Sequence, residues 1–265
     1  MFPWEILRGT TPLIATAIHD GHEIGPAARP FLALDDETRL REEDPFTGIL
    51  AEISDTRIVV HRSRFEVDLN RPRARAVYVR PEDAWGLDVW KKDLPEEVIE
   101  SALREYDLFN AGLFALLDEW AERYGTFVVY DLHSYNHRRN GPDSTPADPA
   151  ANPEVNIGTG TLDRERFGGI VDSFMDGMRQ ANFMGRKLDI RENVKFQGGD
   201  FSRRIHERYP GRACVLAIEF KKIFMDEWTG EVRGEALRSL KSALAATVPD
   251  VLRELAELNN ISPSP

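Results

Sequence analysis

Histidines follow two apolar runs of this chain, and imidazole is a common ligand of metal ions. His19 and His22 flank Asp-Gly in "IATAIHDGHEIGP", and His133 closes the run "TFVVYDLH" much later in the chain. Gly21 allows the backbone to turn tightly between the first two histidines. A catalytic zinc usually takes three protein ligands, for which imidazole and carboxylate groups are suitable, and leaves one position for water. The spacing therefore indicates a metal site that contains these three histidines.

The competing interpretation of these histidines is structural. A lone histidine at the end of a strand is more often a hydrogen-bonded structural residue than a metal ligand, but here two separate strand ends carry one. Asp131 lies two residues before His133 and could fix the orientation of an imidazole ligand by a hydrogen bond to its other ring nitrogen. The pattern alone leaves the structural and the metal-binding interpretations open.

Two arginine-containing segments could hold the carboxylate of a substrate. In "HRSRFEVDLNR", Arg64 and Arg71 lie close to Asp68, which could hold one of them in place. A guanidinium group binds a carboxylate through two parallel hydrogen bonds. Arg138 in "YNHRRN" is a further candidate for contact with an anion. The alternative for the first segment is a solvated strand with alternating charge, and the pattern favours neither.

Glu219 lies near the end of the apolar run "CVLAIEF". A carboxylate is costly to bury there unless it has a partner or a chemical role. Next to a catalytic metal it could act as the general base that accepts a proton from water. The alternative is a salt bridge to Lys221 or Lys222, and charge alone favours that alternative.

The elements that must carry these residues alternate along the chain. Apolar runs predict buried strands, and longer segments with helical spacing predict helices. The predicted strands are 12–18, 57–63, 126–132 and 214–220, and the predicted helices are 95–125, 163–180 and 234–258, the last with a break before Pro249. This order predicts one α/β domain over residues 1–265, with a mixed, mostly parallel sheet between helices on both faces. Active sites of such sheets lie beyond the carboxyl ends of the strands.

Composition limits the classes of function. The chain has 265 residues, of which 42% are hydrophobic, and a net charge of −11. An acidic protein is unsuited to binding the phosphate backbone of nucleic acids. The single cysteine, Cys214, cannot form an internal disulfide, and no stretch approaches the roughly 20 apolar residues of a membrane helix. We therefore expect a cytoplasmic protein without nucleic-acid or membrane partners. The segment 140–154, rich in Pro, Asp and Asn, is expected to be a loop near the site or a lid.

Short motifs spread over most of the chain resemble the N-formylglutamate amidohydrolase family. In order along the chain they are "HDGHEIGP", "REEDPFTGIL", "SRFEVDLNR", "DLHSYNHRR", "NPEVNIGTGT", "FQGGDFSRR" and "AIEFKKIFMDE". Each motif is short, but their order and spacing together are specific. The resemblance implies a phosphorylase/hydrolase-like fold, similar to that of zinc carboxypeptidases and aspartoacylases, in which helices cover both faces of a mixed sheet.

The resemblance also implies roles for individual residues. His19 and His133 match the first and the last zinc ligand of these relatives, and Glu219 matches their general base. Asn70 and Arg71 in "DLNR" match the pair that holds the substrate.

For the middle ligand the sequence offers three candidates. His22 ranks first, because carboxypeptidase-like relatives have an acidic ligand at that position, three residues after the first histidine. Asp44 in "REEDPFT" ranks second, since it matches an acidic position that recurs in N-formylglutamate amidohydrolases, and Glu23 ranks third.

The resemblance and the residues together predict a zinc-dependent amidohydrolase with one zinc ion per chain. Its expected partner is a small anionic N-acyl amino acid, with N-formyl-L-glutamate as the first candidate. One alternative is a deacylase or carboxypeptidase-like hydrolase with another acyl or peptide substrate. Another is a non-catalytic carboxylate-binding protein of the same fold, which would not need Glu219 as a base.

Overall fold

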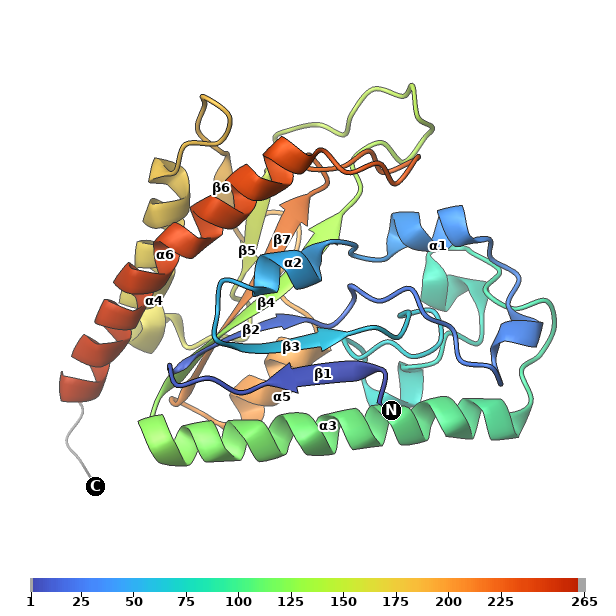
Figure 1. Cartoon of the computed structure of the whole chain (residues 1–265), viewed down its shortest axis with the longest axis horizontal. Coiled ribbons are helices and arrows are strands. Elements are labelled where there is room, and N and C mark those ends of the chain that lie inside the picture. Colours follow the sequence, from blue (N-terminus) through green and yellow to red (C-terminus); the bar gives the residue numbers. More distant parts are fainter. Residues whose placement is uncertain (1, 262–265) are drawn as a thin grey trace.

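A sheet of seven strands runs through the middle of the molecule, with helices on both faces (Figure 1). The structure is a computed structural model that describes residues 2–261. The strands, in the spatial order β1-β3-β2-β4-β7-β5-β6, are β1 (Trp4–Leu7), β3 (Thr56–Val60), β2 (Leu13–Ala17), β4 (Phe127–Tyr135), β7 (Ala213–Lys221), β5 (Val155–Gly158) and β6 (Ile190–Glu192). The central strands β3, β2, β4 and β7 are parallel. β1 and β5 run antiparallel to their neighbours β3 and β7, and β6 is parallel to β5.

Helices cover the two faces of this sheet with separate apolar cores. The helices are α1 (Asp36–Glu42), α2 (Thr47–Ala51), α3 (Glu96–Tyr124), α4 (Arg164–Gln180), α5 (Asp200–Arg208) and α6 (Gly234–Ile261), with short 3-10 helices η1 (Arg29–Phe31), η2 (Arg73–Arg75) and η3 (Pro81–Ala84). α2, α4 and α6 pack on one face, and α3 and α5 pack on the other. β4 serves both cores, because Val128 and Tyr130 point to the first and Phe127 and Val129 to the second. The predicted fold, a mixed and mostly parallel α/β sheet between helices, is confirmed.

The four predicted strands and three predicted helices are present, with small differences at their ends. β4 continues to Tyr135, three residues beyond the predicted end, so His133 lies within the strand. Asp163 caps α4, since its side chain accepts a hydrogen bond of 3.0 Å from the backbone N–H of Arg166. Among residues 2–261, no helix is both long and apolar enough to cross a membrane.

α6 does not break before Pro249, so that prediction is wrong. Proline inside a helix lacks a hydrogen-bond donor and costs roughly 3 kcal/mol. Here the helix is held on both sides of the proline by the core under α4 and α6. Leu244 precedes Pro249, Val251 and Leu255 follow it, and all three side chains are buried. Burial of apolar surface along the whole helix therefore outweighs the local cost.

One buried hydrogen bond joins β4 to α6. The Thr247 hydroxyl donates its one proton to the backbone carbonyl of Leu244 over 2.7 Å, so the Tyr130 hydroxyl, 2.9 Å from Thr247 Oγ1, is the donor of the bond between these two side chains. Both Tyr130 and Thr247 are fully buried. Thr247 thus keeps a partner if the Tyr130 hydroxyl is removed, whereas the Tyr130 hydroxyl loses its acceptor if Thr247 is replaced by valine.

This asymmetry predicts an order of stabilities. Thr247→Val leaves a buried donor unpaired and should lower the free energy of unfolding by about 1–3 kcal/mol. Tyr130→Phe removes only the net value of one hydrogen bond and should cost about 0.5–1.5 kcal/mol. Urea unfolding of both variants and of the double variant measures this, and the double variant should be no less stable than Thr247→Val. Equal losses in the two single variants would contradict the assignment of the Tyr130 hydroxyl as the donor.

Candidate metal and active site

A cavity of about 580 Å³ lies at the carboxyl ends of β2, β4 and β7. His19 follows β2 after one intervening residue, and His133 and Glu219 lie near the ends of β4 and β7. Since these three strands are parallel neighbours, their ends meet at the same edge of the sheet. The cavity is lined by His19, Arg41, Glu42, Asp44, Arg64, Asn70, Arg71, Pro72, Trp85, His133, Ser134, Tyr135, Asn136, Arg139, Thr161, Phe196, Gly198, Gly199, Asp200, Arg203, Glu219 and Lys222.

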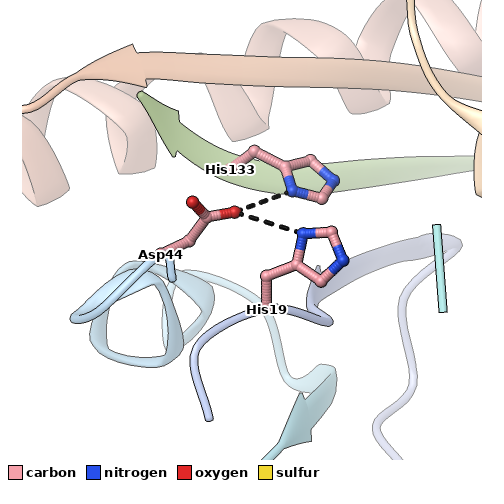
Figure 2. A group of neighbouring side chains, drawn as sticks. All are labelled: His19, Asp44 and His133. Carbon is pink, nitrogen blue, oxygen red and sulfur yellow. Dashed lines mark hydrogen bonds and ion pairs between the residues drawn. The ribbon is translucent and has the colours of Figure 1, made fainter. Parts of the chain in front are cut away.

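His19, Asp44 and His133 line this cavity, and their side chains point toward one another (Figure 2). Asp44 Oδ2 lies 3.4 Å from His19 Nδ1 and 3.0 Å from His133 Nδ1. One ligand atom from each residue lies within 4.8 Å of the other two, and all three side chains are buried. Asp44 comes from the loop between α1 and α2, so the cluster combines two strand ends with a loop.

The cluster fits a zinc ion. Two ligand atoms that each lie about 2.1 Å from a tetrahedral ion are about 3.4 Å apart, close to the two distances around Asp44 Oδ2. Two imidazoles and a carboxylate are a donor set that zinc accepts in catalytic sites. His19 Nδ1 is buried and makes no hydrogen bond within residues 2–261, so its lone pair is available to a metal. The cluster can therefore hold a metal ion.

Carboxylates lie behind both imidazoles. Asp68 Oδ1 lies 2.7 Å from His19 Nε2, and Asp131 Oδ2 lies 3.1 Å from His133 Nε2. A carboxylate at one ring nitrogen keeps the proton there and leaves the other nitrogen free for a metal. Asp131 thus has the position that the sequence predicted for it. The contact of Asp68 with His19 was not predicted.

His22, the first-ranked candidate for the middle ligand, does not lie in this cluster. Its Nδ1 lies 2.5 Å from Glu43 Oε2, and its Nε2 lies 3.0 Å from a guanidinium nitrogen of Arg39. The turn is the physical reason, because Gly21 packs against the backbone of His61 so closely that a Cβ would lie 2.2 Å from its carbonyl carbon. The order of candidates is therefore corrected: Asp44 lies with the two histidines, and His22 does not.

Glu23, the third-ranked candidate, is also outside the cluster. Its side chain is exposed, and its backbone pairs with the segment that follows β3. The backbone N–H of Glu23 donates to the carbonyl of His61 over 2.9 Å.

Glu219 lies directly beside the cluster. In the parallel pairing of β4 and β7 it is the register partner of His133, and its partly buried side chain lines the cavity. Burial raises the pKa of Glu219 to about 7, and the negative charges of Asp44 and Asp131 contribute to this increase. A carboxyl group with this pKa can exchange a proton near neutral pH.

The salt-bridge alternative for Glu219 is not what the structure shows. Lys222 Nζ donates to the backbone carbonyls of Arg41 and Glu43, over 2.5 and 2.7 Å. Lys221 lies two residues after Glu219 in β7, and the carboxylates that act on its charge are those of Glu154 and Asp189. Within residues 2–261, no ion pair joins Glu219 to either lysine.

Arg64 is only 12% exposed in its side chain and is already neutralised by the protein. It donates to Asp68 Oδ2 over 2.9 Å and to the Tyr78 hydroxyl over 3.3 Å. Burial opposes the ionisation of Asp68, but the positive charge of Arg64 and the hydrogen bonds with His19 and Tyr78 hold the pKa of this carboxyl well below its usual range. Asp68 thus supports both an arginine and a histidine of the cavity wall.

Arg71 is the more accessible arginine of the pair. Its side chain is 30% exposed, and its Nε lies 3.7 Å from Asp68 Oδ2, longer than a hydrogen bond. The neighbouring Asn70 accepts a hydrogen bond of 2.9 Å from the backbone N–H of Phe201. Gly199 permits this approach, since a Cβ there would lie 2.1 Å from Asn70 Oδ1. The guanidinium of Arg71 is therefore free to contact a substrate.

Arg138 does not line the cavity, in contrast to the prediction. Its backbone N–H donates to Glu227 Oε1 over 2.5 Å, and its guanidinium reaches the carbonyl of Pro142. The next residue, Arg139, lines the cavity instead, with Glu42 at 3.5 Å. The motif "YNHRRN" does lie at the cavity, but the arginine that faces the cavity is Arg139 and not the predicted Arg138.

The segment 140–154 flanks the site without lining the cavity described above. The backbone N–H of Ala147 donates to the carbonyl of His137 over 2.7 Å, and the Arg191 guanidinium donates to the carbonyls of Pro149 and Ala150. These contacts fasten the segment to its neighbours.

Several cavity residues were not predicted from the sequence. They are Arg41, Glu42, Trp85, Asn136, Arg139, Phe196 and Lys222. Only Lys222 had a usable signal, because a lysine inside the apolar run "AIEFKKIF" is costly to bury without a function. Arg41 and Glu42 end the short helix α1, and the remaining residues come from loops, where the sequence pattern does not fix the direction of a side chain.

Two solved structures share the fold of this chain, and a third is a more distant match. The chain is similar to N-formylglutamate amidohydrolase from Ralstonia eutropha, with a TM-score of 0.74 and 17% identity over 98% of this chain and 99% of that chain. A gene product from Agrobacterium tumefaciens matches with a TM-score of 0.64 and 18% identity over 94% of this chain and 92% of that chain. A metallo-carboxypeptidase from Burkholderia cenocepacia matches with a TM-score of 0.38 and 14% identity, over 91% of this chain and 56% of that chain.

Sequence comparison gives the family. No curated protein matches significantly. The family model described as N-formylglutamate amidohydrolase matches residues 11–225, which include the cavity residues from β2, β4 and β7. The resemblance seen in the sequence motifs is thereby confirmed, and the chain belongs to the N-formylglutamate amidohydrolase family.

Proposed function

We propose that this protein is a zinc-dependent amidohydrolase that cleaves the amide bond of a small anionic N-acyl amino acid, with N-formyl-L-glutamate as the first candidate. Membership of the family makes the chain a hydrolase of the amidohydrolase type. The observation that supports the finer proposal is the convergence of His19, Asp44 and His133 beside Glu219 in one cavity. An accessible arginine, Arg71, lines the same cavity.

The three residues of the cluster would hold one zinc ion per chain. Asp68, hydrogen-bonded to His19 Nε2, favours the tautomer of His19 that offers Nδ1 to a metal, and Asp131 lies 3.1 Å from Nε2 of His133. Zinc, when bound, polarises an acyl carbonyl and lowers the pKa of water.

Glu219 and Arg71 have separate roles, proton transfer and substrate binding. The Glu219 carboxylate accepts a proton from the attacking water and passes it to the leaving nitrogen, as a group with a pKa of about 7 can do in both directions. Arg71 holds the substrate carboxylate through its planar guanidinium. The negative charge of the whole protein makes such a local cation necessary for binding an anion.

Two alternatives share this fold. A deacylase or carboxypeptidase-like hydrolase would use the same residues on another acyl or peptide substrate. A non-catalytic carboxylate-binding protein would need Arg71 but not Glu219. The position of Glu219 next to the cluster, with no lysine paired to it among residues 2–261, supports an enzyme over a binding protein.

Metal content tests the cluster. Asp44→Asn, His19→Ala and His133→Ala should each lose most of the roughly one zinc per chain that a mononuclear site holds. His22→Ala is the comparison variant and should keep more zinc than Asp44→Asn, because His22 contacts Glu43, the residue before Asp44, rather than the cluster itself. Elemental analysis after equal loading measures this. Zinc lost from His22→Ala but kept in Asp44→Asn would refute the assignment.

Glu219→Gln tests the base. Turnover should fall by at least about 10²-fold, the low end for a positioned acid–base group, while zinc content stays unchanged. In the wild type, kcat/KM should rise with pH through a limb at or below about 7, because a bound cation favours the ionised carboxyl. The variant should lack this limb. A Glu219→Gln enzyme with wild-type turnover would exclude the mechanism.

The raised pKa of Glu219 also predicts a pH dependence of stability. The folded protein retains a proton up to about 7, whereas the unfolded chain releases it near the ordinary value of 4.5. Metal-free wild type should therefore lose stability as pH rises through this window, relative to Glu219→Gln. Thermal unfolding of both proteins at about pH 5 and about pH 8, on either side of the window, measures the difference. A difference that does not change with pH would contradict the raised pKa.

Arg71→Lys tests substrate binding. An ammonium cannot reproduce the two parallel hydrogen bonds of a guanidinium, so kcat/KM should fall roughly 10- to 100-fold, which corresponds to about 1.5–3 kcal/mol. Zinc content should not change. Arg138→Lys is the control and should leave kinetics near wild type, since Arg138 lies outside the cavity. Similar kinetics in the two variants would remove Arg71 from the site.

A further inference from the structure

Lys222 is buried in the wall of the cavity and forms its hydrogen bonds with neutral groups. It is 1% exposed and follows the last residue of β7. Its Nζ donates to two backbone carbonyls, those of Arg41 and Glu43, over 2.5 and 2.7 Å. Burial of an ammonium group is costly, and two neutral acceptors compensate only part of the cost. Because its burial is costly, Lys222 is expected to have a role in the site beyond stabilising the fold.

The two carbonyls belong to the segment that brings Asp44 into the cluster. His19 and His133 are placed by the strands β2 and β4, but Asp44 lies between the end of α1 and the start of α2. Its backbone N–H donates to the carbonyl of His19 over 2.9 Å. The position of this one ligand therefore depends on contacts of a short loop rather than on a regular element.

Lys222 joins the loop of Asp44 to the ends of β4 and β7, the strands that contain His133 and Glu219. Lys222 follows β7, which carries Glu219, and its backbone N–H donates over 3.0 Å to the carbonyl of Tyr135 at the end of β4. Its side chain then reaches the residue before Asp44. The residue before Asp44 is Glu43, and its buried carboxylate forms hydrogen bonds with His22 and Ser63.

We propose that Lys222 is a positioning residue of the metal site. It fixes the loop that carries Asp44 and thereby sets the affinity of the cluster of His19, Asp44 and His133 for its metal. The inference rests on the proposed function, because it requires that this cluster binds zinc. Lys222 acts through the backbone carbonyl of Glu43.

A comparison of Lys222→Met with Lys221→Met tests this role. Both replace a lysine near the end of β7 by an apolar side chain of similar length, but only the Lys222 side chain lines the cavity and donates to the carbonyls of Arg41 and Glu43. The zinc dissociation constant of the folded, metal-free proteins is measured by competition with a chromophoric chelator. Lys222→Met should weaken zinc binding about 10- to 100-fold, as is typical for residues that orient metal ligands. Lys221→Met should bind zinc as the wild type does.

A second measurement separates positioning from a merely structural role. Loss of a structural contact would lower the melting temperature of the metal-free protein without changing the zinc affinity of the folded molecules, and that result would overturn the proposal. A raised KM with an unchanged zinc dissociation constant would also overturn it, because it would assign Lys222 to the substrate. If Lys222→Met does not fold, Lys222→Gln, which keeps one donor group, should still bind zinc more weakly than the wild type, and wild-type affinity would overturn the proposal.

Failure of this proposal can be told apart from failure of the proposed function. A wild-type protein that binds no zinc, or an Asp44→Asn variant that binds zinc as tightly as the wild type, rejects the metal site itself. Normal zinc affinity in Lys222→Met, in a protein whose binding does depend on Asp44, rejects only the role of Lys222.

Discussion

Three buried carboxylates surround two imidazoles at one end of the sheet, and this concentration of charge governs the site. Asp44, Asp68 and Asp131 all lie within 3.4 Å of a ring nitrogen of His19 or His133. Arg64, at 2.9 Å from Asp68, compensates one of the three charges. Buried carboxylates without a counter-charge are costly, so the arrangement favours a bound cation between Asp44 and the histidines. Binding of a cation there would also stabilise the folded state.

The sheet explains why distant residues meet, and much of this follows from sequence. Apolar runs long enough to cross the core predict β2, β3, β4 and β7, and three long segments with helical spacing predict α3, α4 and α6. Because parallel strands end at the same edge, the prediction that His19, His133 and Glu219 come together needed only the strand ends. β1, β5 and β6 were not predicted, since strands of three or four residues leave too short a pattern.

Asp44, the third residue of the cluster, shows a limit of prediction from the sequence pattern. Spacing favours His22 over Asp44, because His22 lies three residues from His19 and Asp44 lies 25 residues away. The outcome is decided by packing of Gly21 against the backbone of His61, which turns His22 toward Glu43. Such contacts join segments far apart in the chain and leave no periodic signal. The same reason applies to the arginine after β4, where a change of one residue reverses the side of the chain that faces the cavity.

His22 still contributes to the site, although it lies outside the cluster. Together with Ser63 it holds the carboxylate of Glu43, while Lys222 holds the Glu43 carbonyl from the side of β7. The residue before Asp44 is therefore fastened through both its side chain and its backbone. A ligand on a loop needs this double fastening, since no ladder of strand hydrogen bonds restricts it. The two histidines of "HDGHE" thus have different positions, because the first lies in the cluster with Asp44 and His133, and the second contacts the residue before Asp44.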